Sequence, residues 1–313
     1  MFLKSYVAVL LALTLIVASE RDRRVITTLR FSRYYVKPTV VNGEPARPNE
    51  FPYLVSLKEP IQRITDSIKK WVSFCGGSII SESKVLTAAH CFESHNFYYL
   101  RNPKPIRAVA GNLHTDLIHS GETVTTKNTQ WRRIAKIIIH RHFYFPTNDI
   151  ALCFVDKIWV FNSNVDYIIT ARWRTDYDAK CVASGYGKTK SNVIDSISPV
   201  LLMAKISVLS QRACSKLWEI NMDSFICTDS ALTDVAEGDS GGPLVCRGTL
   251  DPTENGSNGL LVGVVSGKNF DLTTLFTRVS EYHDWIDRNL ASCLRSDILC
   301  LIIIILVNYC SFF

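Results

Sequence analysis

The stretch that decides the fold of this chain is Glu237-Gly238-Asp239-Ser240-Gly241-Gly242-Pro243. A serine held between glycines contributes almost no apolar surface, so the stretch is not a packing motif. It gives the backbone a tight path with exposed N–H groups and directs one hydroxyl outward. This arrangement suits a nucleophile beside an oxyanion hole, provided that a base elsewhere takes the hydroxyl proton. On its own, the stretch does not exclude an ordinary loop.

Two other segments offer the base and its partner. His90 lies in Leu86-Thr87-Ala88-Ala89-His90-Cys91, at the end of an apolar, β-prone run, Ser78–Leu86. Asp149 lies in Asn148-Asp149-Ile150-Ala151-Leu152 and opens an apolar run that would bury its carboxylate. A buried carboxylate is costly unless it is paired. An imidazole N–H is a good partner, and the pair would fix the tautomer in which the other ring nitrogen accepts the serine proton.

In the order His90, Asp149 and Ser240, the three motifs resemble those of the chymotrypsin/trypsin-like serine peptidases. The resemblance covers roughly residues 40–290. It implies an all-β fold, in which two packed antiparallel β-barrels are followed by a C-terminal α-helix and the active site lies between the barrels.

The rest of the sequence agrees with this fold. Short β-prone stretches, such as Tyr53–Leu57 and Leu260–Ser266, are separated by turn residues. Helical periodicity is convincing only over residues 280–290, where Ser280 is the expected N-cap.

The resemblance implies a serine endopeptidase that hydrolyses protein or peptide substrates through an acyl-enzyme. By this resemblance Ser240 is the nucleophile, His90 the general base and then acid, and Asp149 the orienting carboxylate. The backbone N–H groups of Gly238 and Ser240 would form the oxyanion hole. No cofactor is expected.

Activation is implied in the same way. In the family, the residue at Asp239 pairs with the α-amino group that zymogen cleavage creates. The segment Val40-Val41-Asn42-Gly43 resembles the mature amino terminus, so we expect the cut between Thr39 and Val40. Activators of trypsin type need Lys or Arg before the cut, and Thr39 stands there instead. Either a different protease cleaves this bond or the zymogen stays closed. An activating protease and protein inhibitors are therefore expected partners.

Primary specificity should be set by Asp234, which stands where the family places the residue at the base of the specificity pocket. A carboxylate there favours cleavage after Lys or Arg. Ser266 and Gly267 are the other expected substrate-binding residues.

The chain departs from the family around this pocket. Ala236 replaces a common cysteine whose usual partner is missing too, so a bracing disulfide is absent. Thr274 stands where a glycine admits the substrate side chain, and its β-branch would narrow the pocket. Two stretches, 58–70 and 92–105, are longer than in the family and flank the expected cleft, where loops often carry selectivity.

Composition narrows the function further. The chain has 313 residues, 47% of them hydrophobic and 20% charged, enough for a sizeable core. Its net charge of +6 is spread along the chain without a long basic block, which argues against nucleic-acid binding. No Cys-x-x-Cys pattern occurs, and Asn112 replaces an early acid of the family's calcium loop, so no metal is expected.

The two ends predict targeting. Residues 1–19 combine a lysine, an apolar stretch and small residues before a charged run, which indicates a secretory signal peptide, with a retained membrane anchor as the alternative. The expected order is a signal peptide over 1–19, a propeptide over 20–39, the peptidase domain over 40–292 with its linker near 163–174, and a hydrophobic tail over 293–313.

Secretion makes the ten cysteines readable as disulfides. The resemblance pairs Cys75 with Cys91, Cys181 with Cys246, and Cys214 with Cys227. Cys153 fits a buried free thiol better than a bridge, whereas Cys293, Cys300 and Cys310 are unassigned. Asn255-Gly256-Ser257 is an N-glycosylation acceptor pattern in a polar loop.

Two alternatives remain open. Residues 298–307 are all apolar, but a membrane-spanning helix needs about 20 such residues. Membrane attachment, a glycolipid-anchor signal and burial against the domain are the three interpretations. The second alternative concerns function: Thr39 and the altered pocket also fit a catalytically weak or inactive homologue that acts as a binding or regulatory module.

Overall fold

The computed structural model describes the backbone of residues 35–36, 38–41, 43–63, 68–111, 118–120, 128–177, 180–186, 200–229, 234–236, 239–254, 258–269 and 273–290. The expected signal peptide, the C-terminal tail with its three cysteines, Asn112, Gly238 and Asn255 lie outside these ranges. Among the described residues, no helix combines the length and the apolar character that crossing a membrane requires.

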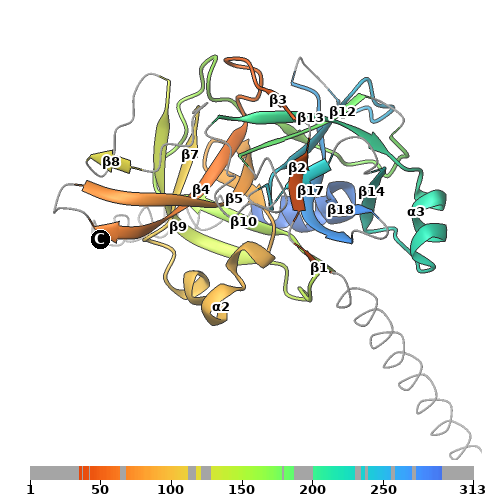
Figure 1. Cartoon of the computed structure of the whole chain (residues 1–313), viewed down its shortest axis with the longest axis horizontal. Coiled ribbons are helices and arrows are strands. Elements are labelled where there is room, and N and C mark those ends of the chain that lie inside the picture. Colours follow the sequence, from red (N-terminus) through yellow and green to blue (C-terminus); the bar gives the residue numbers. More distant parts are fainter. Residues whose placement is uncertain are drawn as a thin grey trace, which may run out of the picture.

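The fold is all-β and consists of two antiparallel β-barrels, as expected (Figure 1). The strands of the first barrel pair in the order β4-β7-β9-β10-β6-β5-β8, and pairing between β4 and β5 closes it. Their bounds are β4 (Leu54–Arg63), β5 (Ile68–Ser81), β6 (Lys84–Thr87), β7 (Arg107–Ala110), β8 (Ile118–Ser120), β9 (Gln130–Ile139) and β10 (Ala151–Val155).

The second barrel follows the order β1-β17-β16-β12-β13-β14-β18, closed by pairing between β17 and β18. Its strands are β1 (Tyr35–Val36), β12 (Lys180–Gly185), β13 (Leu202–Val208), β14 (Phe225–Asp229), β16 (Pro243–Arg247), β17 (Leu260–Asn269) and β18 (Thr274–Arg278). Two short strands also pair with strands of this barrel, β3 (Glu44–Pro45) with β13 and β11 (Ile169–Thr170) with β17. A separate pair is formed by β2 (Pro38–Val41) and β15 (Asp234–Ala236).

The position of each strand in its barrel explains which of its residues are buried. All five residues of β10, Ala-Leu-Cys-Phe-Val, are buried, because the strand lies in the middle of the first barrel with β6 and β9 on its two edges. The five residues of β18 are likewise all buried. One buried cluster fills the first barrel and extends to Val245, Leu261 and Val264 of the second, and a further cluster lies within the second barrel.

One expected strand is two strands in the structure. The run Ser78–Leu86 is interrupted by a turn at residues 82–83, so β5 ends at Ser81 and β6 begins at Lys84. The antiparallel pairing of β5 with β6 makes this a hairpin. The turn contains Glu82 and Ser83, whose polar side chains fit an exposed reversal better than a strand interior.

The helices within the described ranges are few and short. The 3₁₀ helix η1 (His90–Phe92) leads into α2 (Ser94–Arg101), which lies within the longer stretch 92–105. The helix α3 (Gln211–Trp218) is capped by Ser210, whose hydroxyl accepts the N–H of Ala213. The C-terminal helix spans residues 283–290 and follows the 3₁₀ helix η2 (Val279–Tyr282).

The C-terminal helix packs its apolar face as expected but starts later. Tyr282 and Ile286 are buried in the core of the first barrel, and Trp285 and Leu290 pack against that core. Ser280 is not the N-cap, because it lies inside η2 and the α-helix begins only at residue 283.

Three disulfides join the cysteine pairs that the family resemblance implied: Cys75–Cys91, Cys181–Cys246 and Cys214–Cys227. Cys153 is a free thiol, fully buried in β10, and this burial raises its pKa.

Candidate active site

The first barrel brings His90 and Asp149 together. His90 follows β6 and Asp149 precedes β10, and these two strands pair with Ala151 opposite Thr87. Nδ1 of His90 lies 2.7 Å from Oδ2 of Asp149. The backbone N–H of His90 also donates to Oδ1 of Asp149 at 2.8 Å. The carboxylate thus contacts the histidine through both its ring and its backbone.

The second barrel supplies a further donor to the same acid. The hydroxyl of Ser266 in β17 donates to Oδ2 of Asp149 at 2.6 Å. The hydroxyl of Thr277 in β18 donates to the backbone oxygen of Asp149 at 2.9 Å. Asp149 is fully buried, and three hydrogen bonds to its two carboxylate oxygens offset the cost of removing them from water.

These contacts leave the second ring nitrogen of His90 available. Nε2 is buried and has no hydrogen-bond partner among the described residues. The ring of Phe145 lies edge-on to the imidazole, with 5.6 Å between the ring centroids. Since Nδ1 faces a carboxylate, the favoured neutral tautomer carries its proton on Nδ1, and Nε2 is then free to accept one.

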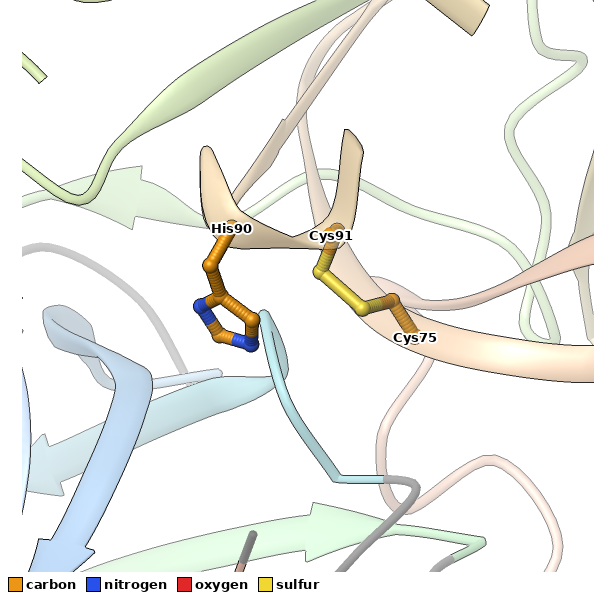
Figure 2. Close-up of side chains that lie close together, drawn as sticks. All are labelled: Cys75, His90 and Cys91. Atoms are coloured by element: carbon orange, nitrogen blue, oxygen red, sulfur yellow. A yellow bond between two sulfur atoms is a disulfide. The ribbon is translucent and has the colours of Figure 1, made fainter. Parts of the chain in front are cut away.

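The disulfide next to His90 excludes a thiolate metal site at this point. Ligand atoms of Cys75, His90 and Cys91 lie within 4.8 Å of one another, a spacing that could suit a metal ion. Figure 2 shows, however, that the two sulfur atoms are bonded to each other. A disulfide sulfur carries no thiolate charge, so the bond braces the histidine loop instead.

Ser240 sits in a loop that is hydrogen-bonded to both barrels. Its backbone oxygen accepts the N–H of Gly76 in β5 at 2.7 Å. On the other side, Gly241 donates to the oxygen of Val265 in β17 at 2.8 Å, and Val265 donates to the oxygen of Gly242 at 2.9 Å. The side chain of Ser240 is 4% exposed. The serine is therefore held at the junction of the barrels by main-chain contacts.

Glycines are required where the loop meets the first barrel. A Cβ on Gly76 would lie 2.9 Å from the Cα of Gly242, which is closer than real Cβ atoms approach backbone. Gly241 has a φ of 76°, in the left-handed region that favours glycine. Glycine is therefore required on both sides of this contact, at Gly76 in β5 and at Gly241 in the serine loop.

Asp239 is buried beside the loop, with its carboxylate against Gly185 of β12. Any side chain at Gly185 would overlap that carboxylate. Of the other expected residues, Asp234 is in β15, and Ser266 and Gly267 are in β17. Val40, the expected mature amino terminus, is in β2 opposite Val235. The structure does not describe Gly238, so the oxyanion hole remains a prediction.

An aromatic cluster anchors α2 next to the histidine loop. The ring of Tyr99 stacks on Phe74 at 6.3 Å, and its hydroxyl donates to Glu59 at 2.5 Å. Burial and the neighbouring Glu59 raise the pKa of Tyr99, so it stays protonated as a donor. Phe97 contacts Phe143 edge-on. Within the longer stretch 92–105, α2 is thus held through the aromatic side chains of Phe97 and Tyr99.

Sequence reasoning missed two contributions to this site. Ser266 is an expected substrate-binding residue, and the structure gives its hydroxyl a contact that was not predicted, with Asp149, a residue 117 positions away. Phe145 lies against the imidazole although no motif marked it. A hydrogen bond between segments that are far apart in the sequence leaves no local pattern. For Phe145, the only signal in the sequence was an aromatic residue directly before Pro146.

Two comparisons with known proteins each match the larger part of the chain. A family model described as Trypsin matches residues 40–286. A trypsin from Sus scrofa is 30% identical over 259 residues, which cover 81% of this chain and 96% of that protein.

Proposed function

The chain belongs to the chymotrypsin/trypsin-like serine peptidases and is a serine endopeptidase, and we propose that it cleaves proteins after Lys or Arg through an acyl-enzyme on Ser240. The observation that carries the proposal is the buried pair of His90 and Asp149. This pair leaves Nε2 of the imidazole as an unpartnered acceptor among the described residues.

Acylation begins when Oγ of Ser240 attacks the carbonyl carbon of the scissile bond. Nε2 of His90 takes the hydroxyl proton as the Oγ–C bond forms, and Asp149 stabilises the resulting imidazolium without accepting a proton itself. The negative carbonyl oxygen is held by the backbone N–H groups of Gly238 and Ser240. The C–N bond then breaks, and His90 gives its proton to the leaving amine.

Deacylation repeats these roles with water. His90 takes a proton from the water as its oxygen attacks the ester carbon. The bond to Oγ breaks, Ser240 recovers its proton from His90, and the carboxylic acid product leaves. No step requires a group beyond the chain, the substrate and water.

Specificity for Lys or Arg is supported by Asp234 in β15, whose carboxylate would pair with the cationic side chain of the substrate. Ser266 and Gly267, in β17, would also contact the substrate. Because Ala236 stands in place of a cysteine, this pocket lacks the disulfide that is common in the family. The β-branched side chain of Thr274 makes the pocket narrower. A narrower pocket favours the slimmer side chain of Lys over that of Arg.

The three disulfides support an extracellular protein, which we propose is secreted through the segment 1–19 and N-glycosylated at Asn255. In this proposal the chain is a zymogen. Val40 becomes the mature amino terminus after cleavage behind Thr39 and pairs with Asp239. The tail over 293–313 would attach the protein to a membrane, which detergent partitioning of the native protein tests.

A panel of serine-directed phosphonates tests the function. Protein processed to begin at Val40 is incubated with analogues of Lys, Arg and Phe, and the labelled residue is identified by mass spectrometry. We expect labelling of Ser240 by the cationic analogues, none in Ser240→Ala, and weakened labelling in Asp234→Ser. Labelling by the Phe analogue alone would overturn the specificity. No labelling of correctly processed protein would indicate the inactive, binding homologue.

A further inference from the structure

The segment just before the expected mature amino terminus forms two strands, and each pairs with a different part of the peptidase domain. In β1, Tyr35 lies opposite Asn269 and Val36 opposite Lys268 at the end of β17. In β2, Pro38 lies opposite Ala236, Val40 opposite Val235 and Val41 opposite Asp234 in β15. In Figure 1, β1 lies beside β17, with which it pairs. Residues 35–41 therefore connect β17 with β15.

The edge of β17 that β1 occupies is the one beside the serine loop. Lys268 pairs with Val36 on one edge and with Thr274 of β18 on the other. The edge away from β18 pairs with β16 and, through Val265, with the main chain of Gly241 and Gly242. Along this edge, β1 follows directly after the loop that presents Ser240.

An extended peptide that is to be cut at Ser240 would need this same edge. Main-chain pairing with an exposed sheet edge is a general way of holding an extended peptide. The N–H and C=O groups of one edge can serve only one strand at a time. The two strands that residues 35–41 connect, β15 and β17, also carry the expected substrate-binding residues Asp234, Ser266 and Gly267.

We propose that β1 is a built-in occupant of the substrate-binding edge, so that the uncleaved chain blocks its own site until the residues before Val40 are removed. The inference rests on the proposed function, because it assigns the edge beside Ser240 to the substrate. It adds a second level of control, since the block is separate from the pairing of a new amino group with Asp239.

The position of the expected cut fits this arrangement. Thr39 lies within β2, where Pro38 and Val40 lie opposite residues of β15 but Thr39 itself is left out of the register. A peptidase binds its substrate as an extended, unpaired strand, so it can reach the bond only when β2 separates from β15. Detaching this segment thus both exposes the cleavage site and frees the edge of β17.

Hydrogen exchange on the full chain tests the pairing without requiring catalysis. The double variant Tyr35→Pro/Val36→Pro removes two N–H groups and prevents β1 from pairing. Of Lys268 and Asn269, we expect the residue whose amide faces β1 to exchange at least tenfold faster in this variant, while the amides of β16 are unchanged. A matched proline pair upstream, Thr27→Pro/Thr28→Pro, should exchange like the native chain. Equal exchange at both Lys268 and Asn269 in all three chains would overturn the proposal.

A binding measurement tests the blocking itself. A fluorescent peptide with the sequence of residues 33–39 is titrated into the native full chain and into the Tyr35→Pro/Val36→Pro chain. It should bind the variant, whose edge is vacant, at least tenfold more tightly than the native chain, and the same peptide with the two prolines should bind neither. Equal affinity for both chains would refute the block. Because neither measurement uses turnover, a failure of catalysis in the phosphonate panel is distinguishable from a failure here.

Discussion

Replacing Asp149 by asparagine tests how the acid controls the histidine. In the native protein Oδ1 accepts the backbone N–H of His90 at 2.8 Å, while Oδ2 accepts Nδ1–H at 2.7 Å and the hydroxyl of Ser266 at 2.6 Å. An asparagine has only one oxygen for these three donors. The backbone N–H cannot change its role, so the amide oxygen must stay in the Oδ1 position. The amide NH₂ then faces Nδ1.

This orientation forces the wrong tautomer on His90. Nδ1 becomes the acceptor of the amide N–H, and the ring proton moves to Nε2, which can no longer take the proton of Ser240. The Ser266 hydroxyl can rotate and accept instead, so the fold is retained. A wrong tautomer in this type of site lowers kcat by about 10⁴-fold, or about 5.4 kcal/mol of transition-state stabilisation.

The assay is the kcat of processed Asp149→Asn protein on a peptide ester, together with NMR detection of the protonated ring nitrogen of His90. Asp156→Asn is the matched control, because Asp156 also accepts a backbone N–H, that of Arg133 at 3.0 Å, but outside the site. We expect native activity from the control. A kcat for Asp149→Asn within tenfold of the native value, with the proton still on Nδ1, would refute the reasoning.

Three further predictions concern the surroundings of His90, Asp149 and Ser240. Ser266→Ala removes a buried hydrogen bond to Asp149. Because hydrogen bonds to charged groups contribute about 1.5–3 kcal/mol, we expect kcat/KM to fall by about tenfold to a hundredfold. A change of less than twofold in steady-state kinetics would contradict this role. Gly76→Ala brings a Cβ against the backbone of the serine loop. We expect the free energy of unfolding, measured in urea, to fall by about 1–3 kcal/mol, and phosphonate labelling of Ser240 to become slower. An unchanged midpoint of urea unfolding would show that the loop can move away. Burial, followed by His142 and two arginines, lowers the pKa of His140, so stability should fall as the pH drops below the ordinary histidine pKa of about 6.5. His140→Gln should lack that component, and an identical pH profile of the unfolding midpoint in both proteins would count against it.

The sequence predicted the fold well because the decisive residues are local. The motif of His90 follows a β-prone run, whereas the motifs of Asp149 and Ser240 come directly before one, and these strand ends meet at the barrel junction as the family resemblance implied. The helical periodicity over residues 280–290 also predicted which side chains enter the core. What failed was local detail: a turn at residues 82–83 divided one expected strand, and a 3₁₀ turn displaced the start of the last helix.

The parts of the site that depend on distant contacts could not be predicted. Ser266 holds Asp149 across the interface between the barrels, and the sequence separation of 117 residues hides that bond. The same is true of β1, whose two residues carry no motif and gain a role only by pairing with Lys268 and Asn269. Such contacts follow from strand order and register, which only the folded chain defines.

The central claim is that Ser240 forms an acyl-enzyme with the help of His90, and pre-steady-state kinetics on processed protein tests it most directly. Mixing the protein with a slowly deacylated p-nitrophenyl ester of lysine should release a burst of one equivalent of nitrophenol per chain, and mass spectrometry of the quenched mixture should find the acyl group on Ser240. A linear release without a burst, or an acyl group on any other residue, would contradict the account.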